Sequence, residues 1–243
     1  KLGNLVVDGG IWLNTQRPEW NDANNALVGH GVSMVTLYYM RRYVRFLQDL
    51  LADERDPVEL SAEVARWLSD TATALAGLHP LLGGGPIDAG QRWRSLEELG
   101  LAASRYRESV YREPAFSGKL RRRPAEIMGL LDDALAAIDH TIRTNRREDG
   151  AYHAYNLLDL QPGEVRVDPL YLMLEGQVAA LSSGAITPDE AATLVEALFD
   201  SDIYRADQHS FMLYPDRPLP GFLEKNRIPQ GGVEGIALLR RMI

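Results

Sequence analysis

The sequence predicts an all-α fold, because long helical patterns follow one another along the 243 residues and only one short β-hairpin interrupts them. Apolar residues recur at spacings of three and four over several stretches, and turn-forming segments separate these stretches. A helical toroid, a helical bundle and a solenoid all fit this pattern. No self-similarity with a period of about 34 or about 40 residues is present, which disfavours an ordinary repeat solenoid.

The first half of the chain predicts four helices after a short strand or turn at 5–13. Gly83-Gly84-Gly85-Pro86 marks a flexible break between the second and third helices, and the third begins at Ala89 or Ser95. The expected helices cover about 26–51, 58–78, 89–111 and 125–145. In the first of them, the residues at spacings of three and four are Val28, Val32, Val35, Tyr39, Tyr43, Phe46 and Leu50.

The second half begins with the short β-hairpin, which is expected between 151 and 167 around a turn at Pro162-Gly163. A helix over about 170–182 follows, and Thr187-Pro188 then begins a helix that ends near Phe199. The stretch 202–230 is rich in proline, aromatic and polar residues, so we expect a functional or wrapped loop there. A last short helix is expected to close the sequence.

Composition excludes several classes of protein. The net charge of −8 argues against a general nucleic-acid-binding protein, which needs a basic surface. The chain has no cysteine, which fits a reducing, cytoplasmic location, and no apolar run has the length of a membrane span. The first residues do not resemble a signal peptide and are typical of the middle of a domain. We therefore expect the chain to be a piece of a longer polypeptide.

The segment 17–29 carries most of the functional information. It concentrates charged, amide and aromatic side chains just before the first long helical pattern. Sugars need amide and carboxylate partners for their hydroxyl groups and aromatic rings for their C–H faces. The segment therefore predicts a sugar-binding loop, and its candidate binding residues are Arg17, Glu19, Trp20, Asn21 and Asn25.

Trp20-Asn21-Asp22, followed by Asn25, Gly29 and a long helix, resembles a motif of the cellobiose phosphorylase family of inverting glycoside phosphorylases. A second patch is similar to a later segment of that family, with Asp168, Gln177 and residues 182–185 at matching places. Glu19 stands where the family usually has Asp. The family's glycine-rich phosphate-binding segment has no clear counterpart in this sequence.

The resemblance implies an (α/α)6-barrel, either as a single catalytic domain over 1–243 or as the C-terminal part of one, with an insert or peripheral helices at about 82–123. It also implies that Asp22 is the general acid and that Trp20 belongs to the wall of the sugar site. The expected activity is cleavage of a glucoside-type oligosaccharide by phosphorolysis or by hydrolysis. No resident cofactor is expected, although inorganic phosphate is a possible co-substrate.

Besides the general acid, hydrolysis and phosphorolysis need different groups in the site. An inverting hydrolase uses a second carboxylate to activate water, whereas a phosphorylase binds phosphate with cationic or N–H donors. Glu224 is the first candidate for the second carboxylate, and Asp216 or Glu175 are weaker candidates. Gln177 lies between apolar neighbours, so it is either part of a buried network or a ligand contact.

A non-catalytic interpretation competes with the enzyme. Asp22 can act simply as the N-cap of the helix that follows it, in a helical scaffold or a sugar-binding domain. No pair of histidines has the spacing of a zinc site, so no metal is expected. The expected partners are an oligosaccharide and either the rest of a longer chain or further copies of this one, with neither nucleic acid nor membrane.

Overall fold

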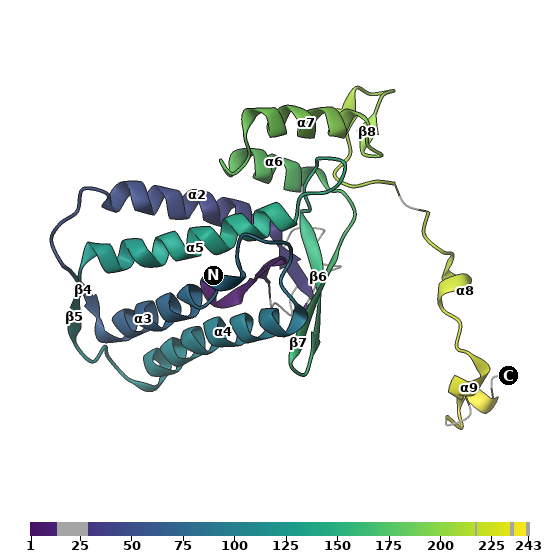
Figure 1. The fold of residues 1–243 in the computed structure, drawn as a ribbon. Coiled ribbons are helices and arrows are strands. Elements are labelled where there is room, and N and C mark those ends of the chain that lie inside the picture. The colour runs from purple at the N-terminus through teal and green to yellow at the C-terminus, as the bar shows by residue number, and fades with distance from the viewer. Residues whose placement is uncertain (14–28, 217, 234–235, 242–243) are drawn as a thin grey trace.

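The computed structural model describes residues 1–13, 29–216, 218–233 and 236–241, and most of its helices lie side by side (Figure 1). The helices and 3-10 turns are η1 (Leu2–Asn4), α2 (Met34–Leu51), α3 (Ala62–Ala76), η2 (His79–Leu81), α4 (Ala89–Arg112), α5 (Pro124–Thr144), α6 (Leu174–Ser182), α7 (Pro188–Phe199), α8 (Phe222–Lys225), α9 (Gln230–Val233) and η3 (Leu239–Arg241). The strands are β1 (Leu5–Val6), β2 (Gly10–Trp12), β3 (Gly31–Ser33), β4 (Val58–Ser61), β5 (Lys119–Arg122), β6 (Tyr155–Gln161), β7 (Glu164–Pro169), β8 (Tyr204–Arg205) and β9 (Ser210–Phe211).

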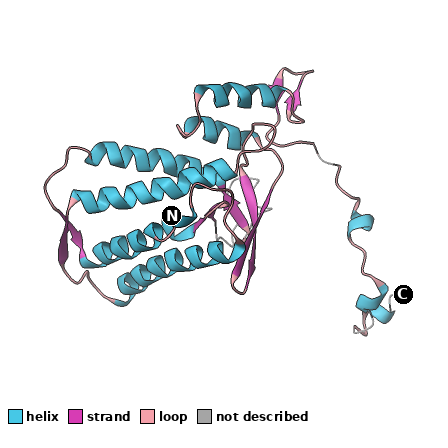
Figure 2. Cartoon of the chain, viewed as in Figure 1, coloured by secondary structure: helices cyan, strands magenta, loops and turns pink. Residues whose placement is uncertain are grey.

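Four long helices form a row in the order α2, α5, α3, α4, and α6 and α7 continue it beyond α2 (Figure 1). The small sheet of β4 and β5 lies at one end of the long helices, and the main sheet lies at their opposite end (Figure 2). Helix α4 contacts β1 and β7, and α2 contacts β2. The main sheet is therefore joined to both outer helices of the group of four, α2 and α4.

The main sheet has five strands in the order β1-β2-β3-β6-β7, and every neighbouring pair is antiparallel. Its central pairing joins distant segments, because Ser33 of β3 lies opposite Tyr155 of β6. The hairpin of β6 and β7 turns at Pro162-Gly163, where Gly163 has the positive φ of 81° that such a turn favours. The predicted β-hairpin is thus confirmed.

The predicted fold class is wrong. The chain combines helices with a five-stranded antiparallel sheet, so the fold is mixed rather than all-α. Within the described residues, the helices form an open row rather than the closed ring of an (α/α)6-barrel. The physical reason is that β1, β2 and β3 are only two or three residues long and gain stability from pairing with each other and with β6.

Capping residues fix where the helices begin. The Asp88 side chain accepts a hydrogen bond from the Gln91 N–H (2.8 Å), and the Gln91 side chain accepts one in return from the Asp88 N–H (3.1 Å). Ser33 caps α2, which therefore begins at Met34 rather than near residue 26. Thr187 caps α7 as predicted.

The buried face of α2 differs from the predicted one. Met34, Leu37, Tyr38 and Val44 are buried in the main core. Four further apolar residues of the same helix are exposed, and these are Tyr39, Tyr43, Phe46 and Leu50. The pattern alone could not distinguish the two faces, because α2 is apolar on both.

The span 82–123, expected as an insert or as peripheral helices, contains α4 and β5. Helix α4 packs against α3 and contacts the main sheet, and Arg92 in its first turns is buried. This span therefore contributes to the structure of the site described below.

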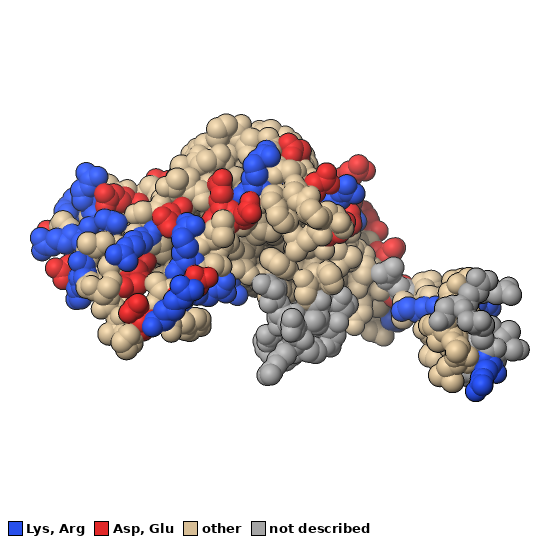
Figure 3. Space-filling view, turned by 90° about the horizontal axis from the view of Figure 1, so that it is seen from below, with Lys and Arg blue, Asp and Glu red and all other residues tan. Residues whose placement is uncertain are grey.

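No helix in the described part of the chain is long and apolar enough to cross a membrane. On the face that Figure 3 shows, positive and negative side chains lie among one another over the helical part. That face therefore offers no continuous basic surface for a nucleic acid, and the net charge of the chain is −8.

Candidate functional site

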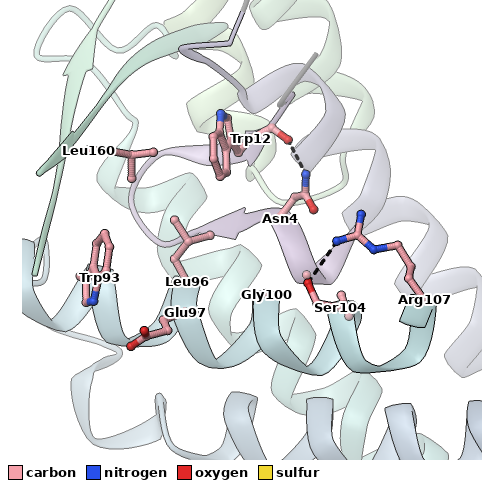
Figure 4. A pocket seen from close by; sticks show the side chains of 11 residues that line it. Asn4, Trp12, Trp93, Leu96, Glu97, Gly100, Ser104, Arg107 and Leu160 are labelled. Atoms are coloured by element: carbon pink, nitrogen blue, oxygen red, sulfur yellow. Dashed lines mark hydrogen bonds between the residues drawn. The ribbon is translucent and has the colours of Figure 1, made fainter. Parts of the chain in front are cut away.

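A cleft of about 480 Å³ runs along one face of α4, next to the main sheet (Figure 4). Trp12 of β2, Trp93 of α4 and Leu160 of β6 surround its apolar end. Asn4, Ser104 and Arg107 line its other end. Glu97 adds a carboxylate, and the remaining lining residues are Gly3, Leu96, Gly100 and Ala103. The cleft therefore combines two indoles with amide, hydroxyl, carboxylate and guanidinium groups.

The sequence of α4 places these groups on one face. Trp93, Glu97, Gly100, Ser104 and Arg107 follow each other at spacings of three and four, which align residues along one side of a helix. The middle of this face carries small side chains, so the backbone of η1 can approach it closely. Larger side chains at these positions would fill the cleft.

Gly3 makes that close approach possible. A Cβ atom added at Gly3 would lie 2.5 Å from the Cβ of Ala103, which is too close for two carbon atoms. Glycine is therefore required for η1 to pack on α4 at the floor of the cleft.

Two hydrogen bonds hold Trp12 in place. Asn4 Nδ2 donates to the Trp12 carbonyl oxygen (2.9 Å), and Trp12 Nε1 donates to the carbonyl oxygen of Gly29 (3.1 Å). Trp12 and Trp93 also pack against a small apolar cluster of Val6, Val32, Leu96, Leu158 and Val165. Both indoles are half-buried, so each keeps part of its ring for a ligand.

The charged groups of the cleft are available to a ligand. Arg107 Nη2 donates to Ser104 Oγ (3.1 Å), which is a neutral partner. Among the described residues, neither Arg107 nor Glu97 takes part in an ion pair. A guanidinium without an acidic partner can donate to hydroxyl groups or to an anion such as phosphate.

A second cleft of about 360 Å³ continues the first one. It shares Gly3, Asn4, Ala103 and Arg107 with the first cleft and adds Lys1, Val64, Trp67 and Tyr106. The Trp67 and Tyr106 rings lie 6.3 Å apart between centroids, at 50°. Along α4, Trp93 and Tyr106 are separated by about 20 Å of helix axis. We call the two clefts together the aromatic groove.

A buried polar network fixes the walls of the aromatic groove. Asp8 Oδ2 accepts hydrogen bonds from Arg92 Nη2 (2.8 Å) and from the Ile87 N–H (2.9 Å). Asp8 Oδ1 lies 3.0 Å from His140 Nε2, and the Gly83 N–H donates to His140 Nδ1 (3.3 Å). Since Nδ1 accepts, Nε2 carries the proton and donates to Asp8. Asp8, Arg92 and His140 form what we call the Asp8 network.

The Asp8 network is charged and almost fully buried. Burial raises the pKa of Asp8, but the hydrogen bonds from His140 and Arg92 outweigh burial and hold that pKa below its ordinary value. Arg92 also donates to the carbonyl oxygens of Val7 and Val165, both at 2.8 Å. The network thus ties the turn before β2 and the strand β7 to the first turns of α4.

The predicted catalytic loop lies outside the described residues. This applies to Arg17, Glu19, Trp20, Asn21, Asp22 and Asn25. The described residues on either side of segment 14–28 lie close together, because the Leu13 N–H donates to the Gly31 carbonyl (3.0 Å) and Trp12 Nε1 donates to the Gly29 carbonyl (3.1 Å). Both flanks of the loop therefore lie at Trp12, a wall of the aromatic groove.

The structure does not bring Glu224 to the aromatic groove. Glu224 is exposed in α8, on a C-terminal stretch that lies apart from the helical row and the main sheet (Figure 1). Its Oε2 accepts a hydrogen bond from the Gly221 N–H (2.9 Å), so it caps its own short helix. Asp216 lines a different hollow with Tyr171 and Tyr214.

Gln177 is a member of a buried network, the first of its two predicted alternatives. Its side chain is fully buried. Oε1 accepts from the Tyr152 N–H (2.8 Å), and Nε2 donates to the carbonyl oxygens of Tyr152 (2.6 Å) and Met173 (3.0 Å). Its amide therefore binds α6 to the segment before β6. Glu175, a weaker candidate base, is half-buried in the same helix.

The sequence analysis missed the residues of the aromatic groove. The predicted site residues lie in segment 17–29 and between residues 175 and 224, yet Trp93, Glu97 and Arg107 of α4 line the cleft. One signal was available: Trp93, Gly100 and Arg107 recur every seven residues and so share a face of the helix. In the described part of the chain, no group of three acidic or histidine side chains is placed to hold a metal ion.

No protein-family model matches this chain, and no curated protein matches it. The resemblance to glycoside phosphorylases therefore remains a hypothesis that rests on the motif of segment 17–29.

Proposed function

We propose that this chain is a carbohydrate-active domain that binds a glucoside-type oligosaccharide in the aromatic groove and cleaves a glycosidic bond. One observation carries the proposal. The chain has four tryptophans, and Trp12, Trp67 and Trp93 all line the groove. The fourth, Trp20, belongs with Asp22 to the segment 14–28, whose described neighbours Leu13 and Gly29 lie at Trp12.

The chemistry of the groove supports a sugar ligand. Half-buried indole rings offer apolar faces for the C–H surfaces of sugar rings. Asn4, Glu97, Ser104 and Arg107 offer the donors and acceptors that hydroxyl groups need. The separation of Trp93 from Tyr106, about 20 Å along α4, suits an oligosaccharide better than a single sugar ring.

Cleavage needs a proton donor on the glycosidic oxygen, and Asp22 is the proposed donor. For hydrolysis, we propose Glu97 in place of Glu224 as the second carboxylate, because Glu97 lines the groove and Glu224 does not. For phosphorolysis, Arg107 is the proposed phosphate ligand, because it has no acidic partner among the described residues.

Binding is tested first, by calorimetry and tryptophan fluorescence with glucose and with β- and α-linked gluco-oligosaccharides of increasing length. Trp93→Leu keeps apolar contact with the adjoining cluster but removes the indole, so we expect at least tenfold weaker binding. The matched control is Tyr111→Ala, which removes a highly exposed aromatic ring from the same helix outside the groove. Equal affinity of all three proteins for every sugar would refute the proposed site.

Cleavage is tested by sugar release with and without phosphate. Sugar 1-phosphate that forms only with phosphate, and is lost in Asp22→Asn and Arg107→Ala, supports phosphorolysis. Release without phosphate that is lost in Asp22→Asn and Glu97→Gln supports hydrolysis. Binding in the groove without any release supports the second candidate, a non-catalytic sugar-binding domain, which the single carboxylate among the described lining residues favours.

A further inference from the structure

Helix α2 has a second apolar face, which the rest of the described chain does not cover. Tyr39, Tyr43, Phe46 and Leu50 are 46%, 59%, 57% and 64% exposed. They follow each other at spacings of four, three and four, so they form one continuous stripe along the helix. We call these four residues the α2 stripe.

An exposed apolar stripe is unusual on a helix whose opposite face is already buried in the core. The opposite face of α2 packs in the core through Leu37, Tyr38 and Val44, so the helix is apolar on two sides. A helix that is apolar all round is normally buried, and a contiguous exposed apolar patch normally marks an interaction site. The Tyr43 and Phe46 rings stack on each other at 6.4 Å and 27°, which makes the centre of the stripe a flat aromatic surface.

The geometry points to a second copy of this chain as the partner of the α2 stripe. If two α2 helices pack antiparallel about a two-fold axis between Tyr43 and Phe46, each stripe residue meets an apolar residue of the other copy. Tyr39 then lies opposite Leu50, and Tyr43 lies opposite Phe46. A two-fold interface requires such self-complementarity, because the same patch serves both copies.

Charges beside the stripe select the antiparallel orientation. Arg42 and Asp49 are exposed and seven residues apart, so they lie along the same margin of the stripe. In the antiparallel pair, the same margins of the two helices meet, and Arg42 of each copy faces Asp49 of the other. A parallel two-fold pair would bring opposite margins of the two stripes together, so Arg42 and Asp49 of the two copies would lie on opposite sides of the interface and could not form these ion pairs.

Both charges are free to make these contacts. Among the described residues, neither Asp49 nor Arg42 takes part in an ion pair, and Arg42 Nη1 donates to the neutral hydroxyl of Ser182 (2.7 Å). Two intermolecular ion pairs would therefore form without breaking an existing one.

The test measures the mass of the full chain in solution by light scattering and sedimentation, from about 1 µM to about 500 µM. We expect a dimer of twice 27.1 kDa at high concentration. Phe46→Glu should convert it to a monomer. The matched control is Phe222→Glu, because Phe222 is 77% exposed but belongs to the C-terminal stretch rather than the α2 stripe. The control should remain a dimer.

A charge exchange tests the orientation. Arg42→Glu alone and Asp49→Arg alone should each weaken the dimer about threefold to tenfold, and the double variant should restore it. A wild type that is monomeric throughout the series would overturn the proposal. So would a dimer that survives Phe46→Glu, a dimer that Phe222→Glu abolishes, or single charge variants that the double variant does not rescue.

Discussion

Replacing Asp8 by asparagine is the sharpest test of how the structure holds its groove together. Asparagine keeps the shape of the side chain and tolerates the left-handed backbone of Asp8, where φ is 64°. The substitution therefore removes the negative charge without adding backbone strain. Arg92 keeps its charge and remains buried.

The expected loss in the free energy of unfolding follows from the burial of the Asp8–Arg92 ion pair. The side chains of Asp8 and Arg92 are only 6% and 9% exposed, and their Oδ2 and Nη2 atoms are 2.8 Å apart. Removing one partner of a buried ion pair costs about 3–5 kcal/mol, because the other charge is left without compensation. Arg92 retains carbonyl partners and asparagine retains one acceptor, so we expect a loss near the lower end, about 3 kcal/mol.

The assay is urea unfolding followed by far-UV circular dichroism at pH 7. The urea concentration at the midpoint should fall, while the slope of the free energy of unfolding against urea concentration stays the same, because the surface exposed on unfolding is unchanged. The control is Asp53→Asn, which alters an exposed carboxylate outside the helices and strands and should change the free energy of unfolding by less than about 0.5 kcal/mol. A loss below about 1 kcal/mol for Asp8→Asn would refute our account of the network.

The pH dependence gives a second, independent check. The pKa of Asp8 is lowered in the folded state, so its stabilising contribution is complete above the unfolded value of about 3.9. The contribution is lost as the pH falls through the lowered native pKa. The difference in stability between the wild type and Asp8→Asn should therefore be largest at neutral pH and should shrink below about pH 4. A difference that grows on acidification would contradict the assignment.

Three further predictions concern packing and the site. Gly176→Ala would place a Cβ 2.6 Å from the Cβ of Ala154, so thermal melts should show that the free energy of unfolding falls by about 1–3 kcal/mol. Gln177→Leu leaves the buried N–H and carbonyl of Tyr152 without their side-chain partner, so chemical denaturation should show a loss of about 2–4 kcal/mol. Glu224→Gln should leave sugar binding and sugar release unchanged in the assays above, since Glu224 lies away from the groove; a loss of activity would restore it as a catalytic candidate.

The sequence predicted the long helices well because each carries enough turns for its periodicity to be clear. The start of α4 agrees with one of the two predicted positions, and Thr187 caps α7 as expected. The hairpin was also predictable, since Pro162-Gly163 separates two strands of six or seven residues. These are local features, and local sequence determines them.

The sheet and the groove were not predictable because they depend on contacts between segments that are far apart in the sequence. A strand of two or three residues shows no alternation, and the pairing of Ser33 with Tyr155 depends on contacts between distant parts of the chain. The buried face of α2 was ambiguous because both faces are apolar. Trp93 stood among charged neighbours on α4, and only the approach of η1 and β2 turns that face into a cleft.

The Asp8 network links the stability of the protein to the shape of the groove. Asp8 lies in the turn that leads into β2 and Trp12, and Arg92 directly precedes Trp93 in α4. Loss of the Asp8 charge should therefore shift the two indoles relative to each other. Gly176→Ala acts on α6, which contributes no residue to the groove. Asp8→Asn should thus weaken sugar binding even under conditions where it is fully folded, whereas Gly176→Ala should lower stability alone.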